Sequence, residues 1–504
     1  MNFFDNLALG FGVALTPMNL LLAFVGVFLG TIIGVLPGIG PMTGIALLIP
    51  ITFGLQPASA IILMAGIYYG AMYGGSTTSI LVNAPGESSS VVTCFDGYQM
   101  AKKGRAGPAL AAAAIGSFIA GTFATLMLML VGPWVAGFAL NFGPPEYFSL
   151  MFAGLTVVTS LAGRSLVKAL LATTIGLAIA TIGIDLQSGV ARYTFRNPEL
   201  LDGLEFLVVA IGLFALSEVI VNLSNMRQAV QERLSIKGGL WLTKEDWKRA
   251  TPAFIRGTLS GFFVGGIAGA GAAVASFVSY GLEKKMSKYK DELGTGAIEG
   301  VAAPEAANNA AAGGALIHLL CLGIPGSGTT AIMLGALLMI GLQPGPLLFQ
   351  QNPQFVWGLI ASMYVGNVML LVLNLPLVGM WVKILDIPLY LLVLFIILFS
   401  FLGVYTMNNS VQDLWLMIGF GVVGYLLRRL DIPAAPIILG MVLGDLMEQA
   451  ARQSLMISDG SLAIFVTRPI SLFLLLLAVV SITNPYWKYI GIGIRRLFAP
   501  RSVG

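Results

Sequence analysis

Two glycine-rich segments carry hydroxyl side chains beside a Pro-Gly pair in a sequence that is otherwise almost free of charge. They span residues 74–90 and 323–330. Loops of this kind expose hydroxyl and backbone hydrogen-bond donors without a fixed charge, which suits contact with a substrate. A third glycine-rich turn, at residues 37–40, also begins with Pro-Gly. The predicted substrate-binding residues are Gly38, Gly40, Ser76, Thr77, Thr78, Asn83, Pro85, Gly86, Pro325, Gly326, Ser327, Gly328, Thr329 and Thr330.

Amide side chains near these segments predict a site for a coupling cation. Adjacent Asn308 and Asn309 lie among alanines, with no hydrophobic pattern that would explain them. Their carbonyl oxygens suit Na⁺ or contacts to a substrate. The predicted coupling-ion residues are Asn83, Asn308, Asn309 and Thr330. The alternative is structural: Ser and Thr would cap helix ends in loops at the membrane surface, and the asparagines would cap a helix near Ala310.

Membrane helices are the elements that must position these residues. Of 504 residues, 57% are hydrophobic and 10% are charged, whereas a soluble domain has about 25% charged residues. Residues 6–86 contain no charged residue, and residues 306–382 contain no Asp, Glu, Lys or Arg and one histidine, His318. One span needs about 20 apolar residues. The sequence therefore predicts an all-α polytopic membrane protein with roughly ten to twelve transmembrane segments.

The same composition excludes several other classes of protein. The net charge of +4 is spread over loops, as is usual in membrane proteins, so no nucleic-acid partner is expected. Cys94 and Cys321 stand far apart, which rules out a disulfide framework, and the single histidine leaves no metal site. The sequence contains no phosphate-binding loop of the ATPase type, and no cofactor is expected.

Two pairs of matching segments predict an internal duplication. Gly30–Gly40 matches Gly261–Gly271 at an offset of 231 residues, and Ala84–Ser88 matches Ile324–Gly328 at an offset of 240. A second alignment, which pairs residues 37–40 with 325–328, competes with the first. Internal repeats are a common plan of secondary transporters, whose sites lie at the repeat interface.

The duplication divides the chain into an N-terminal membrane half at 1–235 and a C-terminal membrane half at 236–504. A polar linker at about 222–256 joins them. Within it, Thr243 followed by Asp246 resembles a helix N-cap. Whether the repeats are inverted or parallel, and which way the chain lies in the membrane, stays open.

Four stretches of charge-free or nearly charge-free sequence contain residues that interrupt membrane helices. Gly, Pro, Ser, Thr and Asn gather in Gly34–Pro50, Gly70–Ser90, Gly261–Ser276 and Glu299–Thr330. A broken backbone in lipid leaves unpaired N–H and C=O groups, at several kcal/mol each, unless protein or a water-filled cavity satisfies them. These stretches therefore predict re-entrant or broken helices that build a transport site.

Other polar residues leave alternatives open. Ser76 and His318 suggest an intramembrane hydrolase pair, but no third group supports it, and His318 suits a hydrogen-bonded core position better than a proton shuttle. Asp445 and Glu448 suit either a proton relay or, because Arg452 is near, an interfacial ion pair. A passive anion channel is a further alternative.

Several long motifs resemble one known family, the large membrane subunit of the tripartite tricarboxylate transporters. The resemblance rests on the loop at 37–40, the blocks at 73–87, 95–108, 299–309 and 322–330, and the stretch at 440–455, and it runs over nearly the whole chain. At Asp445 the family more often has an apolar residue or proline, so no shared role is assigned there.

The resemblance implies a bacterial inner-membrane permease driven by an ion gradient of Na⁺ or H⁺. It implies two partners, a small membrane subunit and a periplasmic binding protein that delivers a tricarboxylate or dicarboxylate; a homo-oligomer is possible. Because the candidate segments hold almost no Lys or Arg, such an anion would be held by hydroxyls and by the positive ends of broken helices. The resemblance leaves Glu87, Glu305, His318 and Asp445 without a role.

Overall fold

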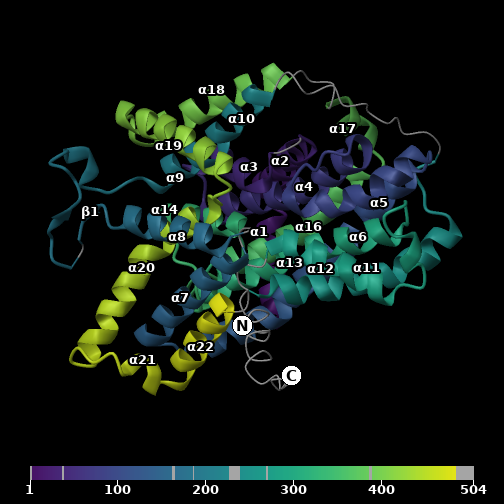
Figure 1. The fold of residues 1–504 in the computed structure, drawn as a ribbon. Coiled ribbons are helices and arrows are strands. Elements are labelled where there is room, and N and C mark those ends of the chain that lie inside the picture. The colour runs from purple at the N-terminus through teal and green to yellow at the C-terminus, as the bar shows by residue number, and fades with distance from the viewer. Residues whose placement is uncertain are drawn as a thin grey trace, which may run out of the picture.

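The protein is built almost entirely of helices, as a hydrophobic and charge-poor sequence requires when backbone groups must be satisfied without water. The computed structural model describes residues 3–36, 39–161, 165–185, 187–225, 239–267, 271–384 and 389–483. Within these ranges the sole strands are β1 (Gly183–Ile184) and β2 (Ala191–Arg192), a short antiparallel pair that projects from one edge (Figure 1). The all-α prediction is confirmed.

Helices follow one another along the described chain. The first seven are α1 (Phe3–Ala14), α2 (Pro17–Val35), α3 (Pro41–Leu48), α4 (Pro57–Val82), α5 (Val91–Lys102), α6 (Ala106–Ala139) and α7 (Pro144–Leu161). Next come α8 (Leu166–Ala180), α9 (Phe206–Ala210) and α10 (Ser217–Asn225), the last two joined by a π-helical stretch, Ile211–Leu216. The next seven are α11 (Lys244–Gly265), α12 (Gly271–Met286), α13 (Glu299–Ile317), α14 (Gly328–Met339), α15 (Leu348–Gln351), α16 (Pro353–Asn374) and α17 (Val378–Ile384). The last five are α18 (Leu389–Asn408), α19 (Val411–Arg429), α20 (Ala435–Ile457), α21 (Ile464–Thr467) and α22 (Pro469–Thr483).

Six helices in the described ranges are long and apolar enough to cross a membrane by themselves. They are α2, α4, α6, the continuous α9–α10 helix, α16 and α19. Six shorter apolar stretches of 10–17 residues accompany them. The protein is therefore a multi-pass membrane protein, and the count of ten to twelve crossings stays a prediction that depends on how the shorter helices enter the bilayer.

Two helix pairs pack through the same glycine register, which supports the internal duplication. In the first pair, a Cβ on Gly30 of α2 would lie 2.4 Å from the carbonyl oxygen of Ile67 on α4. In the second, a Cβ on Gly261 of α11 would lie 2.4 Å from the carbonyl oxygen of Ala307 on α13. The glycines are offset by 231 residues and their partners by 240, the two offsets found in the sequence.

The glycine contacts continue one helical turn in each direction. Gly26 and Gly34 of α2 contact α4, and Gly257 and Gly265 of α11 contact α13 in the same way. A Cβ added to any of these four glycines would lie less than 3 Å from the backbone of the opposing helix. Spacing of small residues by four positions allows membrane helices to approach this closely. Each pair is thus a compact backbone-to-backbone unit from which the loops at its ends project.

The predicted breaks interrupt helices at corresponding places. α4 ends at Asn83, and the π-helical turn that extends α13 (His318–Leu322) ends at Gly323; both residues adopt the left-handed conformation that commonly ends helices. A Pro-Gly pair follows two residues after Asn83 and two after Gly323. The helical structure is also interrupted between α2 and α3 and between α11 and α12, as expected.

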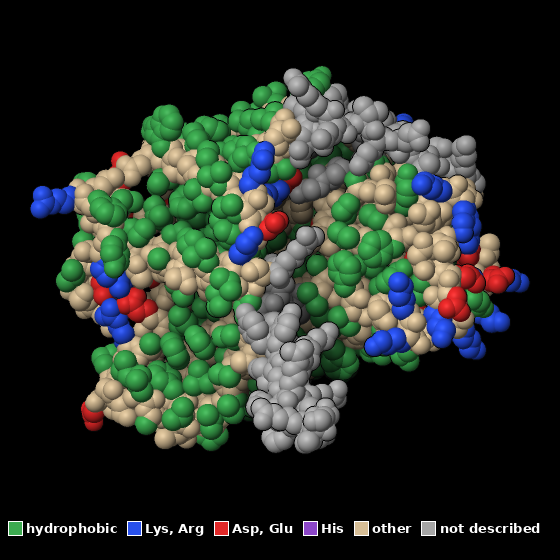
Figure 2. All heavy atoms as spheres, in the orientation of Figure 1, with side chains coloured by type: hydrophobic (Ala, Val, Ile, Leu, Met, Phe, Trp, Pro, Cys, Tyr) green, Lys and Arg blue, Asp and Glu red, His purple; other side chains and the backbone are tan. Residues whose placement is uncertain are grey.

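The surface matches a protein surrounded by lipid. Hydrophobic side chains cover much of the face in Figure 2, and charged ones gather over α5 and α11 at one edge. Trp134, Phe263 and Phe473 are each more than 60% exposed on helices. Such surface suits a lipid environment or a membrane partner.

The polar linker is described in part. Residues 226–238, which include the predicted boundary at 235, lie outside the described ranges, so the division into halves at that point stays a prediction. Beyond them, Thr243 caps α11: its hydroxyl accepts the Asp246 N–H at 3.1 Å, and the Asp246 carboxylate accepts the Thr243 N–H at 3.1 Å. The predicted N-cap is confirmed.

Candidate functional site

The candidate site is a cavity of about 610 Å³ at the helix breaks. Its volume falls within the range of about 300–1,000 Å³ that is typical of small-molecule sites. Residues predicted from both halves line it. They are Gly40 and Pro85 from the first half and Ser327, Gly328 and Thr329 from the second. The structure thus places residues of both segments at one cavity, and their role in binding a substrate stays a prediction.

Four helix N-termini border this cavity. The lining includes the N-cap and first residues of α3 at Gly40–Thr43, the first turn of α12 at 271–274, the start of α14 at 327–329, and the residues 432–435 that lead into α20. The first N–H groups of a helix have no intrahelical acceptor, and the helix dipole places about half a positive charge there. The sequence predicted this arrangement for broken helices in general but did not reveal the contribution of α20.

Close contacts around Gly328 show how tightly these termini converge. A Cβ on Gly328 would lie 2.6 Å from the Met42 sulfur of α3 and 3.2 Å from the Ala435 Cβ of α20. A Cβ on Gly271, the first residue of α12, would lie 3.8 Å from the Ser327 Cβ. The Tyr68 hydroxyl of α4 lies 3.5 Å from the Ser327 hydroxyl and links the two halves directly.

The cavity has almost no fixed positive charge. Among its described lining residues, Arg428 of α19 is the one basic side chain. Its guanidinium pairs with Glu218 of α10 at 2.5 Å, and this carboxylate offsets its charge. The expectation of a site nearly free of Lys and Arg is therefore met, and the helix ends supply the positive potential.

Several predicted site residues form hydrogen bonds within helices and do not line the cavity. The Thr330 hydroxyl accepts the Ser327 N–H at 2.8 Å in a capping box that begins α14. The Thr78 hydroxyl donates to the Gly75 carbonyl within α4, and Thr77 is buried in the same helix. Thr330 and Thr78 thus match the alternative in which hydroxyl side chains stabilise helix ends, because a hydroxyl near a helix end forms hydrogen bonds with nearby backbone groups.

Gly86 and Gly326 permit close backbone approach. A Cβ on Gly86 would lie 2.0 Å from the Gly34 carbonyl oxygen, and a Cβ on Gly326 would lie 2.7 Å from the Ala315 Cα. Pro325 is buried beside Gly326 but does not line the cavity. Gly38 lies outside the described residues.

Asn83 is not brought to the cavity. It adopts the left-handed conformation (φ 58°) that ends α4, and its side chain is exposed. Asn is among the residues that tolerate this conformation best, so the position has a sufficient structural explanation. The structure does not place Asn83 with the other predicted coupling-ion residues.

The adjacent asparagines point to different partners. The Asn308 amide donates to Glu87 Oε1 at 3.1 Å, whereas the Asn309 amide donates to the Ser117 hydroxyl of α6 at 2.7 Å. Successive side chains on a helix diverge by about 100° because a turn holds 3.6 residues. Asn308 therefore lies beside the cavity wall and Asn309 against α6.

Two acidic residues that the sequence left unassigned lie at the centre of this region. Glu305 is fully buried in α13 and accepts hydrogen bonds from Ser76 of α4, at 2.6 Å, and from Thr93 of α5. Glu87 is 7% exposed and lines the cavity. The available signal was their isolation as charges at the edges of charge-free sequence, since ionisable residues inside membrane proteins are usually functional.

The predicted alternatives for Ser76 and His318 are resolved by their partners. The Ser76 hydroxyl donates to Glu305, and His318 Nδ1 lies 3.3 Å from the Gly314 carbonyl oxygen of the same helix. Each side chain is engaged separately, and in the described part of the chain no hydrogen bond joins Ser76 to His318.

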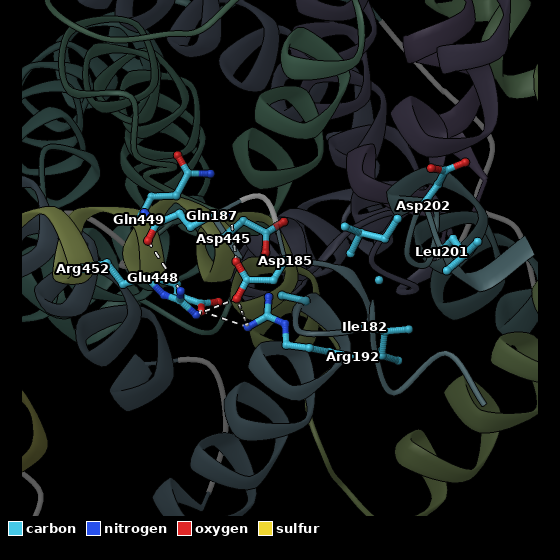
Figure 3. Close-up of a pocket in the computed structure, with 13 residues that line it drawn as sticks. Ile182, Asp185, Gln187, Arg192, Leu201, Asp202, Asp445, Glu448, Gln449 and Arg452 are labelled. Carbon is cyan, nitrogen blue, oxygen red and sulfur yellow. Dashed lines mark hydrogen bonds and ion pairs between the residues drawn. The ribbon is translucent and has the colours of Figure 1, made fainter. Parts of the chain in front are cut away.

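A second pocket, of about 410 Å³, lies where the β1–β2 hairpin meets α20. Figure 3 shows Arg192 and Arg452 between the carboxylates of Asp185 and Glu448. Arg452 pairs with Glu448 at 2.5 Å and with Asp185 at 2.8 Å, and Arg192 pairs with Glu448 at 2.9 Å. The expected ion pair is confirmed for Glu448; Asp445 lies exposed in the same pocket.

The N–H of Gln187 donates to Asp185, and with the N–H of Ser188 and the Arg452 guanidinium it lowers the pKa of that carboxyl to about 2. Asp185 and Glu448 balance Arg192 and Arg452, whereas Asp202 and Asp445 leave the lining with two more acidic than basic side chains. The ion pairs hold the hairpin on α20.

Taken together, the helical fold and the apolar spans define a polytopic α-helical membrane protein, which has a cavity at four helix N-termini. The chain belongs to the tripartite tricarboxylate transporter TctA family, whose family model matches residues 20–439. The family is one of transporters that work as tripartite systems.

Two relatives come from Agrobacterium vitis. An uncharacterised 52.8 kDa protein in the region 3′ of ttuC′ in TAR-I is 50% identical over 477 residues, which cover 94% of each chain. An uncharacterised protein in the corresponding TAR-II region is 46% identical over 222 residues, or 44% of this chain and 92% of the relative. No solved structure matches the chain.

Proposed function

We propose that this protein is the permease subunit of an ion-gradient-driven importer of a carboxylate-bearing organic anion, a tricarboxylate or dicarboxylate. The observation that carries the proposal is the convergence of four helix N-termini on one 610 Å³ cavity. Helix N-termini bind anions through free N–H groups and their positive dipole ends. The family to which the chain belongs supports a transport role for this cavity.

A lining whose one described basic side chain, Arg428, is paired with Glu218 suits a carrier. The N–H groups and the hydroxyls of Ser327 and Thr329 would hold a carboxylate without an ion pair to a buried Lys or Arg. Release of the substrate would then not require such an ion pair to be broken. Each helix end contributes about 0.3–1 kcal/mol near the surface and up to about 2 kcal/mol when partly buried. Four such ends give useful affinity and still allow the substrate to leave.

The proposal includes partners and a location. The broad apolar surface, with exposed side chains such as Trp134 and Phe263, suits lipid and contact with a small membrane subunit. A periplasmic binding protein would deliver the anion at the bacterial inner membrane, as membership of a tripartite family suggests. The coupling cation would be Na⁺ or H⁺.

The direct test is uptake into proteoliposomes that contain the protein and its small subunit. Labelled tricarboxylates and dicarboxylates are supplied with and without the binding protein, while the Na⁺ gradient and the pH gradient are imposed separately. We expect accumulation against the anion gradient that requires one of the two ion gradients and the binding protein. Equilibration without either gradient would identify a passive channel instead.

A charge placed at one helix end tests the anion site. Thr329→Asp puts a carboxylate in the first turn of α14, where it stabilises the helix but repels an anion in the cavity. We expect uptake to fall at least about 10-fold, the effect of about 1.4 kcal/mol of lost affinity. The neutral variant Thr329→Asn and the exposed-site variant Asn83→Gly should keep most of the uptake. If Thr329→Asp transports as well as Thr329→Asn, the anion does not bind at this helix end.

A further inference from the structure

Glu87 and Glu305 bring two carboxylates together in the interior of the protein. Glu87 follows the Pro85-Gly86 turn after α4, and Glu305 lies in the middle of α13. Glu305 is fully buried and Glu87 is 7% exposed. Asn308, whose amide donates to Glu87, lies three residues after Glu305 on the same face of α13, which places the two carboxylates near one another. Like charges this close repel, and burial removes the water that would screen them.

The hydrogen-bond partners of these carboxylates in the described part of the chain are neutral. Glu305 accepts hydrogen bonds from Ser76 and Thr93 on its two oxygens, and Glu87 Oε1 accepts hydrogen bonds from Ser89 and from the Asn308 amide. Among the same residues, neither carboxylate forms an ion pair with Lys, Arg or His. Hydroxyl donors stabilise the ionised form but do not compensate a net charge of two, so a buried pair of this kind must either take up protons or bind a cation.

Asn308 provides a second, independent observation. Its side chain is 1% exposed, and while its Nδ2 donates to Glu87, its carbonyl oxygen Oδ1 has no hydrogen-bond partner among the described residues. An orphaned buried acceptor is costly and calls for an explanation such as an ion. Because the same amide contacts Glu87, its free oxygen lies at the carboxylate pair.

The oxygen set suits a hard monovalent cation. Two carboxylates, the Asn308 carbonyl and the neighbouring hydroxyls offer only oxygen ligands, which hard cations prefer. Both oxygens of Glu305 accept hydrogen bonds, which fits a carboxylate that stays ionised beside a metal ion. The described residues contain no cluster of three His, Cys, Asp or Glu side chains of the kind that holds a transition metal.

We propose that Glu87, Glu305 and Asn308 form the binding site of the coupling cation, and that this cation is Na⁺. The inference rests on the proposed transport function. Because Glu87 lines the anion cavity, Na⁺ at this site would offset one of the two negative charges at the wall that the substrate must approach. Without Na⁺, the negative carboxylates would disfavour an anion at the neighbouring helix ends, and this difference couples the two binding events.

Small residues make the approach of these groups possible. A Cβ on Gly75 of α4 would lie 3.0 Å from the Glu87 Cγ and 3.3 Å from the Ser90 hydroxyl. The 3₁₀ turn at Ser88–Ser90 is closed by a capping box in which Glu87 takes part. The Glu87 side chain is therefore held between α4 and α13 by backbone packing.

The test measures Na⁺ binding directly, without transport. Purified protein in detergent is titrated with ²²Na⁺ at constant ionic strength, with choline as the replacement ion. We expect Glu87→Gln and Glu305→Gln each to weaken Na⁺ binding at least about 10-fold, as loss of metal-site residues does. The matched control is Glu146→Gln, a buried carboxylate that pairs with Arg468 and should leave Na⁺ binding unchanged.

Thermal unfolding shows whether the variants remain folded. Na⁺ should raise the Tm of the wild type above its value in choline, because a ligand that binds the native state stabilises it. Glu305→Gln should unfold in choline at a Tm no lower than that of the wild type, since it removes a buried repulsion, and should lose the Na⁺ effect. Na⁺ binding in the Gln variants equal to that of the wild type would overturn the assignment.

The outcomes for the site and for the proposed function are distinct. If the wild type binds no Na⁺ and anion uptake follows a pH gradient, the Na⁺ site is wrong while the transport proposal stands. If Na⁺ binds as expected but no organic anion is transported under any gradient, the transport proposal fails and the cation site remains.

Discussion

At the scale of single residues, the hydroxyl groups divide into two populations that the sequence does not distinguish. Ser327 and Thr329 line the cavity, whereas Ser76 is bonded to Glu305 and Thr330 caps α14. All four occur in similar Gly- and Thr-rich surroundings. Their roles differ because a side chain in a helix rotates by about 100° per residue, so neighbours face different elements.

The pKa of Asp185 gives a prediction at this scale. Because the Gln187 N–H, the Ser188 N–H and Arg452 lower the pKa of Asp185 from 3.8 to about 2, the folded state gains stability from its ionised form. This gain is fully present above about pH 4 and is lost as the pH falls towards 2. Asp185→Asn should therefore lower the Tm at pH 7, and the difference from the wild type should shrink as the pH falls and disappear below pH 2.

The control for this prediction is Asp459→Asn, at an exposed turn where Asn tolerates the positive φ of the native residue. Its Tm should follow that of the wild type at every pH. A constant deficit of Asp185→Asn down to pH 2 would show that the variant loses packing and not a charge interaction.

At the scale of helices, the pairs α2–α4 and α11–α13 are the rigid units from which the site is built. Their glycine contacts bring backbones so close that no side chain fits between them. The breaks at the ends of these helices then present helix N-termini to a common cavity. The architecture depends on small residues because van der Waals packing drives helix association in lipid.

Equivalent substitutions in the two pairs should have equivalent effects. Gly30→Ala and Gly261→Ala each place a Cβ 2.4 Å from a carbonyl oxygen and should cost about 1–3 kcal/mol of stability. Gly137→Ala in α6 is the control, since no atom lies within 4 Å of its added Cβ and Ala favours the helix. The measurement is thermal unfolding of the detergent-solubilised protein. A tolerated Gly261→Ala beside a disruptive Gly30→Ala would argue against equivalent packing in the two halves.

At the scale of the whole molecule, the cavity and the proposed cation site share one wall. Glu87 belongs to both, and Glu305 and Asn308 reach it from the other half of the chain. Ligands that bind next to one another must influence each other equally, because coupling free energy is reciprocal. The two proposed sites therefore lie at adjacent positions, as the proposed symport would need.

This reciprocity can be measured. Na⁺ should raise the affinity for the organic anion by a factor of about 5–150, and the anion should raise the affinity for Na⁺ by the same factor. In Glu305→Gln the factor should fall towards one. Calorimetric titration of each ligand with and without the other gives both factors. A factor of one in the wild type would contradict coupling between the two sites.

The sequence alone predicts that this is a helical membrane protein with two related halves, because these features depend on local properties of the chain. Charge-free stretches long enough to cross lipid predict membrane helices, and the offsets of 231 and 240 residues reappear in the packing of Gly30 on Ile67 and of Gly261 on Ala307. Pro-Gly pairs after Asn83 and Gly323 mark where helices end, since both residue types oppose a continued helix. These features require no knowledge of which segments meet.

The site itself was decided by the tertiary structure. Ser76 meets Glu305 across 229 positions of sequence and Asn308 meets Glu87 across 221, contacts that no local pattern encodes. Only packing of the two helix pairs brings four helix N-termini to one cavity and leaves Asn83 outside it. The sequence determined what kind of chain this is. The folded arrangement determined which of its polar groups line the cavity and which meet the buried carboxylates, because helix rotation and helix packing decide where a side chain points.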